Sequence, residues 1–213
     1  MPTDPRQKPG KTPRRDLWRS LYRLSAEQVG MMVEHGILPQ GKKIELWDGI
    51  LYRLARGELQ NVITSAIADA MRRAVPEGYQ VRKEKPCSFG ARSLPVLDVA
   101  VCRTGAADFP PKPPDLARLA LVVEVDQTTR PHEKDDRHRR YAEAKIPVYW
   151  QVGAEDRLVS VYRKPEGVGE DARYRRRESY GLTREIPIVI DDREVGRVAV
   201  ADIFPSNPPE AKP

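Results

Sequence analysis

Three carboxylates stand in stretches of the sequence that are otherwise apolar and typical of strands. Glu124 lies within LALVVEV, a run whose length and valine and leucine content indicate a strand covered on both faces. Asp98 repeats this anomaly inside PVLDVAV, and Glu45 comes just before the turn in KKIELWDGILYRL. Burying a carboxylate without compensation costs several kcal/mol or more. Each acid must therefore be neutralised, paired with a cation or bound to a metal ion.

Acids on adjacent strands suggest metal-dependent chemistry. Two carboxylates that face each other repel and titrate abnormally unless a divalent cation lies between them. Such oxygen ligands suit Mg²⁺ or Mn²⁺, which keep water molecules that a phosphate or a nucleophile can replace. The alternative is structural, because each acid could instead pair with one of 37 lysine and arginine residues, such as Arg137. The residues alone leave these two interpretations about equally weighted.

The segment after Glu124 predicts a strand, helix and strand unit. A strongly charged helix is expected at about 132–144, after a turn at 127–131. Glu133, Arg137 and Tyr141 recur on it every four residues, so they share one face. The run IPVYWQV then predicts a second strand. Units of this size are normally right-handed and parallel, so the second strand should lie beside the strand of Glu124.

The remaining chain predicts an α/β architecture. Asp48 and Gly49 separate two alternating runs and form the strongest short-range hairpin signal. An amphipathic helix is expected at about 58–74, followed by strands in QVRKEKPCSF and PVLDVAVCR. LVSVYRK, ARYRRRESY, IPIVI and the stretch around DDREVG alternate like antiparallel strands, which would extend the sheet or form a flanking ribbon.

Length and composition suit one domain with irregular ends. Of the 213 residues, we expect 1–20 to form a disordered basic arm, 21–205 one domain and 206–213 a disordered tail. Cys87 and Cys102 have no metal-binding or redox spacing and should be buried free thiols. No apolar stretch reaches 18 residues, and the amino terminus has no hydrophobic signal region. We therefore expect a cytoplasmic protein with no membrane partner.

The charge of the chain favours a polyanionic partner only weakly. The formal net charge is +6, which suits nucleic acid. However, 31 acidic residues are interspersed with the basic ones, and a basic surface indicates nucleic acid only where it is clustered. Charge alone therefore gives roughly even odds for a DNA or RNA partner.

From about Leu21 to Pro205 the order of motifs resembles the Uma-two family of putative restriction endonucleases, within the PD-(D/E)XK nuclease superfamily. The resemblance rests on ELWDG, PVLDVAV, LVVEV and YAEAKIPVYW. It implies a restriction-endonuclease-like mixed central sheet flanked by helices, to which the alternating C-terminal strands would add an antiparallel ribbon. It also implies that Glu45, Asp98 and Glu124 bind Mg²⁺ or Mn²⁺, and that the protein hydrolyses DNA phosphodiester bonds.

The chain departs from the family where a cationic side chain is usual. The superfamily usually has lysine two residues after the second acid, where this chain has Asp126, and the family usually supplies a lysine at the position of Arg137. Because arginine stays protonated, Arg137 could stabilise developing phosphate charge but could not act as a general base. Lys134, almost one turn earlier, could substitute for it. Other departures are Leu97 for proline, Gln60 for histidine and Lys145 for glycine.

Two functions follow from these residues. The first is a magnesium-dependent deoxyribonuclease in which Asp98, Glu124 and either Arg137 or Lys134 act on DNA. The second is a catalytically weakened nuclease-fold protein that binds nucleic acid or another protein. Cleavage of both DNA strands would call for a homodimer. A metal ion that binds a selective site raises the melting temperature, whereas a structural ion pair does not respond, so metal dependence separates the two.

Overall fold

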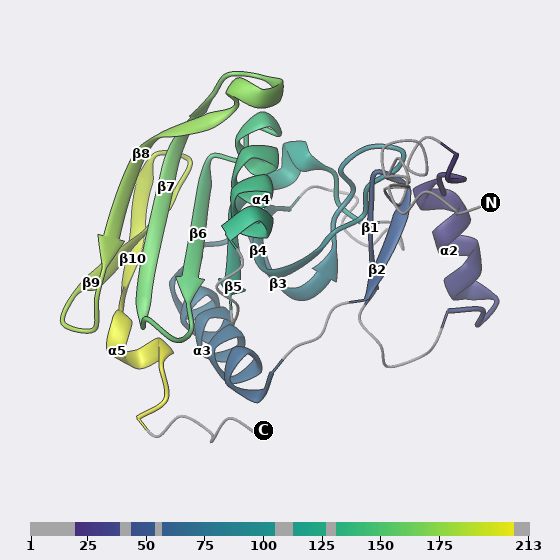
Figure 1. Cartoon of the computed structure of the whole chain (residues 1–213). Helices are drawn as coiled ribbons and strands as arrows, with labels where there is room; N and C mark the ends of the chain where they lie inside the picture. Colours follow the sequence, from purple (N-terminus) through teal and green to yellow (C-terminus); the bar gives the residue numbers. More distant parts are fainter. Residues whose placement is uncertain (1–19, 39–43, 54–56, 105–112, 127–130, 207–213) are drawn as a thin grey trace, which may run out of the picture.

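A computed structural model describes the chain outside residues 1–19, 39–43, 54–56, 105–112, 127–130 and 207–213, and outside the side chains of 131–136. Its centre is a six-stranded mixed sheet in the order β3-β4-β5-β6-β7-β8 (Figure 1). These strands are β3 Tyr79–Pro86, β4 Val96–Arg103, β5 Leu119–Asp126, β6 Val148–Gly153, β7 Leu158–Glu166 and β8 Arg173–Tyr180. The predicted α/β fold class with a mixed central sheet is confirmed. The predicted arm and tail fall on residues outside the described ranges, apart from Ser20 and Ser206.

The strand, helix and strand unit forms as predicted. Helix α4 spans Pro131–Glu143 and connects β5 to β6, which is the parallel pair of the sheet. All other neighbouring strands in the sheet are antiparallel. Both β4 and β5 are buried along almost their whole length, which explains why their sequences are continuous apolar runs.

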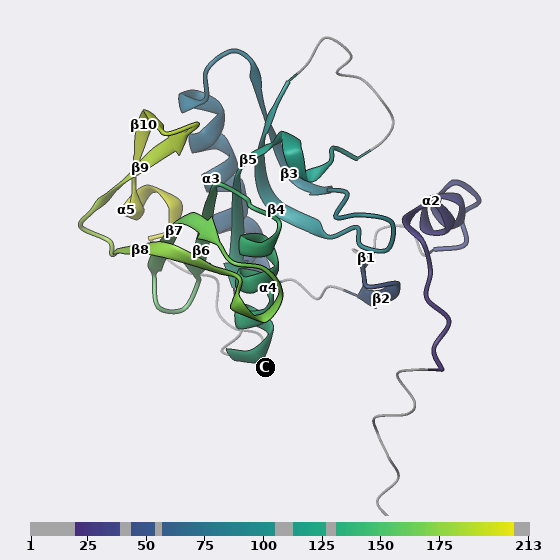
Figure 2. The same cartoon turned by 90° about the horizontal axis from the view of Figure 1, so that it is seen from above.

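Helices cover the two faces of the sheet (Figure 2). Helix α3 spans Glu58–Ala74, as predicted, and buries a stripe that includes Ile63, Ile67 and Met71. This stripe packs into a core with Val99, Val123 and other residues of the central strands. Helix α4 covers the opposite face, where Tyr141, Ala142 and Ile146 join a second core with Val122 and Tyr149.

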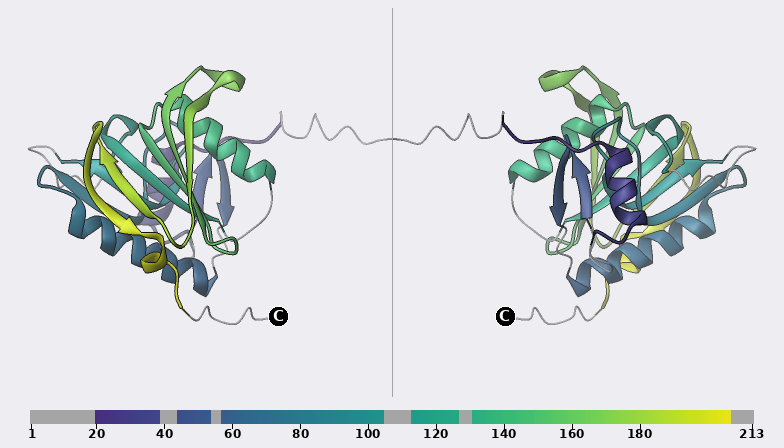
Figure 3. Two further views of the ribbon diagram at one scale, coloured as in Figure 1. Left: turned by 90° about the vertical axis from the view of Figure 1, so that its left-hand side faces the viewer. Right: turned by 90° about the vertical axis from the view of Figure 1, so that its right-hand side faces the viewer.

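Two smaller antiparallel sheets flank the central one. The predicted C-terminal ribbon consists of β9 Glu185–Ile190 and β10 Arg193–Ala199, followed by the short helix α5 Val200–Ile203. The predicted hairpin consists of β1 Ile44–Trp47 and β2 Ile50–Arg53. The ribbon and the hairpin face the viewer in opposite panels of Figure 3. β7 and β8 extend the sheet, so the alternating C-terminal strands take both of the places predicted for them.

The backbone geometry of the hairpin turn explains why Asp48 and Gly49 stand there. Asp48 and Gly49 both have positive φ, 47° and 80°, as a two-residue turn of type I′ requires. A Cβ atom at Gly49 would lie 2.7 Å from the Cβ of Arg23, so glycine is also needed for space. Helix α2, Ala26–Glu34, precedes the hairpin and begins with a capping box between Ser25 and Gln28.

Two further expectations concern the cysteines and the membrane. Cys87 and Cys102 are buried free thiols, as predicted. Burial raises the pKa of the Cys87 thiol to about 12, so this side chain stays protonated and unreactive. Among the described helices, none combines the length and the apolar character needed to span a membrane.

Candidate active site

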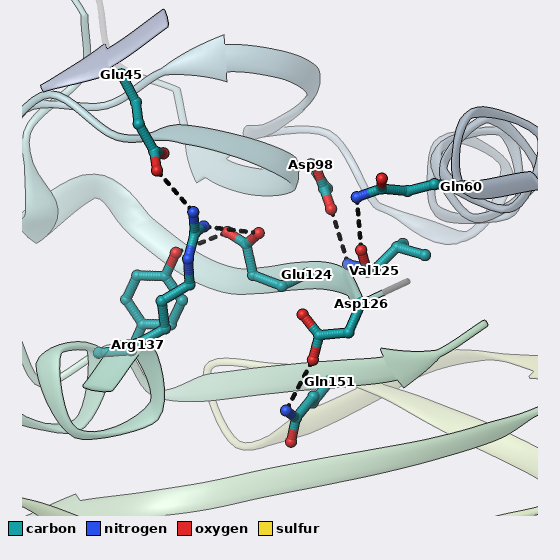
Figure 4. A network of polar contacts seen from close by, with 9 residues as sticks. Glu45, Gln60, Asp98, Glu124, Val125, Asp126, Arg137 and Gln151 are labelled. Carbon is teal, nitrogen blue, oxygen red and sulfur yellow. Dashed lines mark hydrogen bonds and ion pairs between the residues drawn. The ribbon is translucent and has the colours of Figure 1, made fainter. Parts of the chain in front are cut away.

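Asp98 and Glu124 lie side by side where β4 and β5 separate. The antiparallel ladder of these strands ends at the pair Val99 and Val123, and Asp98 and Glu124 occupy the next position. Beyond that point the backbone N–H of Val125 donates a hydrogen bond to Oδ2 of Asp98, at 2.7 Å (Figure 4). Both acids are buried, with 1% and 5% of their surface exposed. The two acidic anomalies of the sequence therefore meet in one place.

Helix α4 supplies two side chains to Glu124. The Tyr141 hydroxyl donates to Oε1 of Glu124 at 2.6 Å, and Nη1 of Arg137 donates to Oε2 at 3.1 Å. Residues four apart share a helix face, so Arg137 and Tyr141 reach the same carboxylate from successive turns. The predicted face of α4 is thus the one that contacts β5.

Glu45 joins the site through the same guanidinium. Nη2 of Arg137 donates to Oε1 of Glu45 at 2.7 Å, so one arginine links the hairpin strand β1 to the central strand β5 (Figure 4). A second ion pair between α4 and the hairpin, Arg140 with Asp48 at 2.7 Å, also holds β1 near the helix. Glu45 is 4% exposed. The third acid therefore lies on a separate hairpin, which is tied to α4 by these ion pairs and to the chain just before β4 by the backbone bridge between Leu46 and Leu94.

Burial dominates the protonation of this cluster. Burial, reinforced by repulsion from Asp98, raises the pKa of Glu124 to about 8, although Arg137 and Tyr141 oppose the rise. Burial alone would lower the pKa of Arg137, but attraction to Glu124, Tyr141 and Glu45 raises it. Burial and the nearby Glu124 also hold the pKa of Tyr141 well above its usual range. At neutral pH, Arg137 is a cation and Tyr141 a neutral donor, so neither can act as a base.

The chemistry of the oxygen donors fits a divalent cation at Asp98 and Glu124. Magnesium sites in proteins are often built from one or two carboxylates completed by water and phosphate oxygens, which this pair could supply. The Arg137 guanidinium contacts both Glu45 and Glu124, so a cationic side chain stands between these two acids. In the described ranges no three Asp, Glu, His or Cys side chains are grouped closely enough to hold a metal ion. Glu45 pairs with Arg137 in this arrangement, and its role as a metal ligand stays a prediction.

Several polar residues near the acids were not assigned to the site from the sequence. Nε2 of Gln60, in the first turn of α3, donates to the Val125 carbonyl at 2.6 Å, so it holds the residue whose N–H binds Asp98. Gln151 on β6 donates to Asp126 at 2.8 Å. The sequence signal for Gln151 was that it is the only residue with an amide side chain in IPVYWQV. The side chain of Lys134, predicted as a substitute cation, lies outside the described residues.

Comparisons with known proteins agree with a nuclease fold. The family model Uma2, described as "Putative restriction endonuclease", matches residues 32–190. The chain is also similar to a crystal structure described as "a putative nuclease belonging to DUF820", from Anabaena variabilis ATCC 29413. The TM-score is 0.56 at 15% sequence identity, over 81% of this chain and 96% of that chain, which shows a shared fold. No curated protein matches the chain.

Proposed function

The chain belongs to the Uma2 family of putative restriction endonucleases, and from this premise we propose that it is a metal-dependent deoxyribonuclease that hydrolyses DNA phosphodiester bonds. The observation that carries the proposal is the buried pair Asp98 and Glu124, set on adjacent strands where their ladder ends. Burying two like charges together is unfavourable, which makes such a pair typical of sites that take up a cation.

Asp98 and Glu124 would hold Mg²⁺ or Mn²⁺. When bound, the ion would act as a Lewis acid and lower the pKa of a water ligand. Glu124 would have to be ionised to hold the ion, and because burial raises its pKa to about 8, metal binding would be favoured as the pH rises. The Tyr141 hydroxyl orients the Glu124 carboxylate, and the Val125 N–H orients Asp98. These contacts position both ligands before a substrate arrives.

Arg137 is the group proposed to meet the scissile phosphate. Guanidinium groups form paired, charge-assisted hydrogen bonds with phosphate oxygens and stabilise charge that develops during hydrolysis. The Arg137 side chain is half-buried, with 23% of its surface exposed, and it forms ion pairs with Glu124 and Glu45. It remains protonated, so its contribution is electrostatic and not that of a base.

The second function, a weakened nuclease-fold protein that binds nucleic acid or another protein, has its own supporting observation. Arg137 already provides a fixed positive charge between Glu45 and Glu124. Asp126 stands where the superfamily usually has lysine, and it accepts a hydrogen bond from Gln151. A site with a resident cation and no lysine at these positions would cut slowly or not at all, while the surrounding surface could still bind DNA.

Cleavage of DNA separates the two functions. Supercoiled plasmid and single-stranded DNA are incubated with the wild type, Glu124→Ala and Glu143→Ala, in MgCl₂, MnCl₂ or EDTA. Glu143 is the control because it is an exposed acid on α4. The nuclease predicts slow cleavage that requires the metal and Glu124 but not Glu143. DNA binding without cleavage supports the second function, and activity that survives Glu124→Ala contradicts the assigned site.

A further inference from the structure

A row of polar residues crosses the sheet from the acid pair to its outer strand. The register places Glu124 beside Gln151, Gln151 opposite Ser160, and Ser160 opposite Ser179. Directly paired residues point to the same face of a sheet, so this row lies on the face that carries α4. With strands about 4.8 Å apart, the row extends about 14 Å from β5 to β8.

Hydrogen bonds connect this row to the end of β5. Gln151 donates to Oδ2 of Asp126 at 2.8 Å, and the Tyr162 hydroxyl donates to Oε1 of Gln151 at 3.1 Å. The first of these bonds is visible beside the acid pair in Figure 4. The Ser160 and Ser179 hydroxyls lie 3.3 Å apart. The end of β5 beside the acid pair and the outer strand β8 therefore both carry side chains that hydrogen-bond to their neighbours along this row.

Arg177 ends the row with an exposed positive charge. Its Nη2 donates to the Ser160 hydroxyl at 3.1 Å, and its guanidinium carbon lies 5.5 Å from the centre of the Tyr162 ring. Arg173 and Arg175 on the same strand both pair with Glu166. Within the described part of the chain, by contrast, Arg177 pairs with no carboxylate. Its guanidinium is positioned by neutral groups, and its charge remains available to an anion.

We propose that Arg177 binds one backbone phosphate of a DNA duplex while another phosphate of the same duplex lies at Asp98 and Glu124. The proposal rests on the proposed function, because it takes DNA as the molecule that enters the site. Nη2 of Arg177 reaches Ser160 on β7, which lies two strand spacings, or about 10 Å, from β5. This separation corresponds to about three base pairs of duplex rise, so one short duplex can make both contacts. A positioned guanidinium is the side chain best suited to a phosphate.

Arg176 provides a matched control for Arg177. The two are consecutive exposed residues on β8, but Arg177 is opposite Tyr162 and Arg176 is opposite Arg163, so their side chains leave opposite faces. Arg176→Ala and Arg177→Ala remove the same charge from the same strand. A difference between them therefore reports the face on which DNA lies and not the net charge of the protein.

The experiment measures the dissociation constant of a duplex of about 20 base pairs in EDTA at several salt concentrations. For Arg177→Ala we expect weaker binding and a salt slope lower by about 0.9, the value for one phosphate contact. The factor by which Arg177→Ala binds the duplex more weakly than the wild type should then shrink about 3.5-fold between 50 and 200 mM salt. Arg176→Ala should follow the wild type, and Arg177→Lys should recover the slope. Equal melting temperatures exclude a folding defect.

Each outcome separates this inference from the proposed activity. Equal losses of DNA affinity in Arg176→Ala and Arg177→Ala, or an unchanged salt slope in Arg177→Ala, overturn the inference. The proposed nuclease activity is then judged by the cleavage experiment alone. A wild type that does not bind the duplex also overturns it. Loss of DNA affinity in Arg177→Ala but not in Arg176→Ala supports the inference even when the wild type cuts no DNA. The absence of cleavage would contradict only the catalytic proposal.

Discussion

Nη1 of Arg137 lies 3.1 Å from Oε2 of Glu124, so an arginine from the crossover helix is the direct counter-ion of the buried acid on β5. The same guanidinium reaches Glu45 on a separate sheet. Because arginine stays protonated at any ordinary pH, this positive charge is permanent. The stability of the site and its response to metal ions should therefore be coupled through one side chain.

Removing the guanidinium should destabilise the protein when no metal is present. In Arg137→Met, Glu45 and Glu124 remain buried without the cation that contacts both. We expect the free energy of unfolding in EDTA to fall by about 3 kcal/mol, as for other broken buried pairs. Urea unfolding at pH 9, above the Glu124 pKa of about 8, measures it. Arg139→Met on the same helix, whose partner Glu143 is exposed, should cost less than about 1 kcal/mol. Equal stability of the two variants would show that the Arg137 contacts contribute little.

A divalent cation should stabilise the wild type through Asp98. Millimolar Ca²⁺ or Mg²⁺ should raise the melting temperature, and Asp98→Ala should abolish that rise, because a ligand that binds only the folded state stabilises it. Without metal, Asp98→Ala should keep or gain stability, since one of two repelling charges is gone. Asp69→Ala, at an exposed acid on α3, is the control and should keep the response. No response to any divalent ion, or a strongly destabilised Asp98→Ala, would favour a purely structural role.

The raised pKa of Glu124 predicts how stability depends on pH. The folded value is about 8 and that of an unfolded glutamate is about 4.3. Between these values the folded state binds more protons, so the free energy of unfolding should fall as pH rises from about 4.5 to about 8. Glu124→Gln should remove this slope. Denaturant unfolding in EDTA across that range tests the prediction, and a slope unchanged by Glu124→Gln would refute it.

The sequence was sufficient to predict the elements and the two acids on the central strands. Acids within the apolar runs around Asp98 and Glu124 were conspicuous because burial of charge needs a reason. The four-residue spacing of Arg137 and Tyr141 on α4 placed them on one face, and both contact Glu124. These features depend on periodicity and local geometry, which one sequence carries.

Contacts between distant elements could not be predicted in the same way. The pairing of Glu45 with Arg137 depends on how the hairpin docks against α4, which no local pattern specifies. The Gln60 bond to the Val125 carbonyl joins residues 65 positions apart. Gln151 aligns with Glu124 only through the register of neighbouring strands, and Tyr162 reaches Gln151 from β7. Register and docking are set by the packing of the whole sheet.

The roles of Arg137 and Glu124 are tested most directly by cleavage of plasmid and single-stranded DNA by Arg137→Lys, compared with the wild type, Lys134→Ala and Arg137→Lys combined with Glu124→Ala. A lysine ammonium can lose a proton where a guanidinium cannot, so Arg137→Lys should raise the cleavage rate in Mn²⁺ or Mg²⁺ above a weak or absent wild-type rate. The combined variant should be inactive. Unchanged cleavage in Arg137→Lys with activity lost in Lys134→Ala would transfer the cationic role to Lys134, and cleavage by the combined variant would contradict the assignment of Glu124 as the central acid.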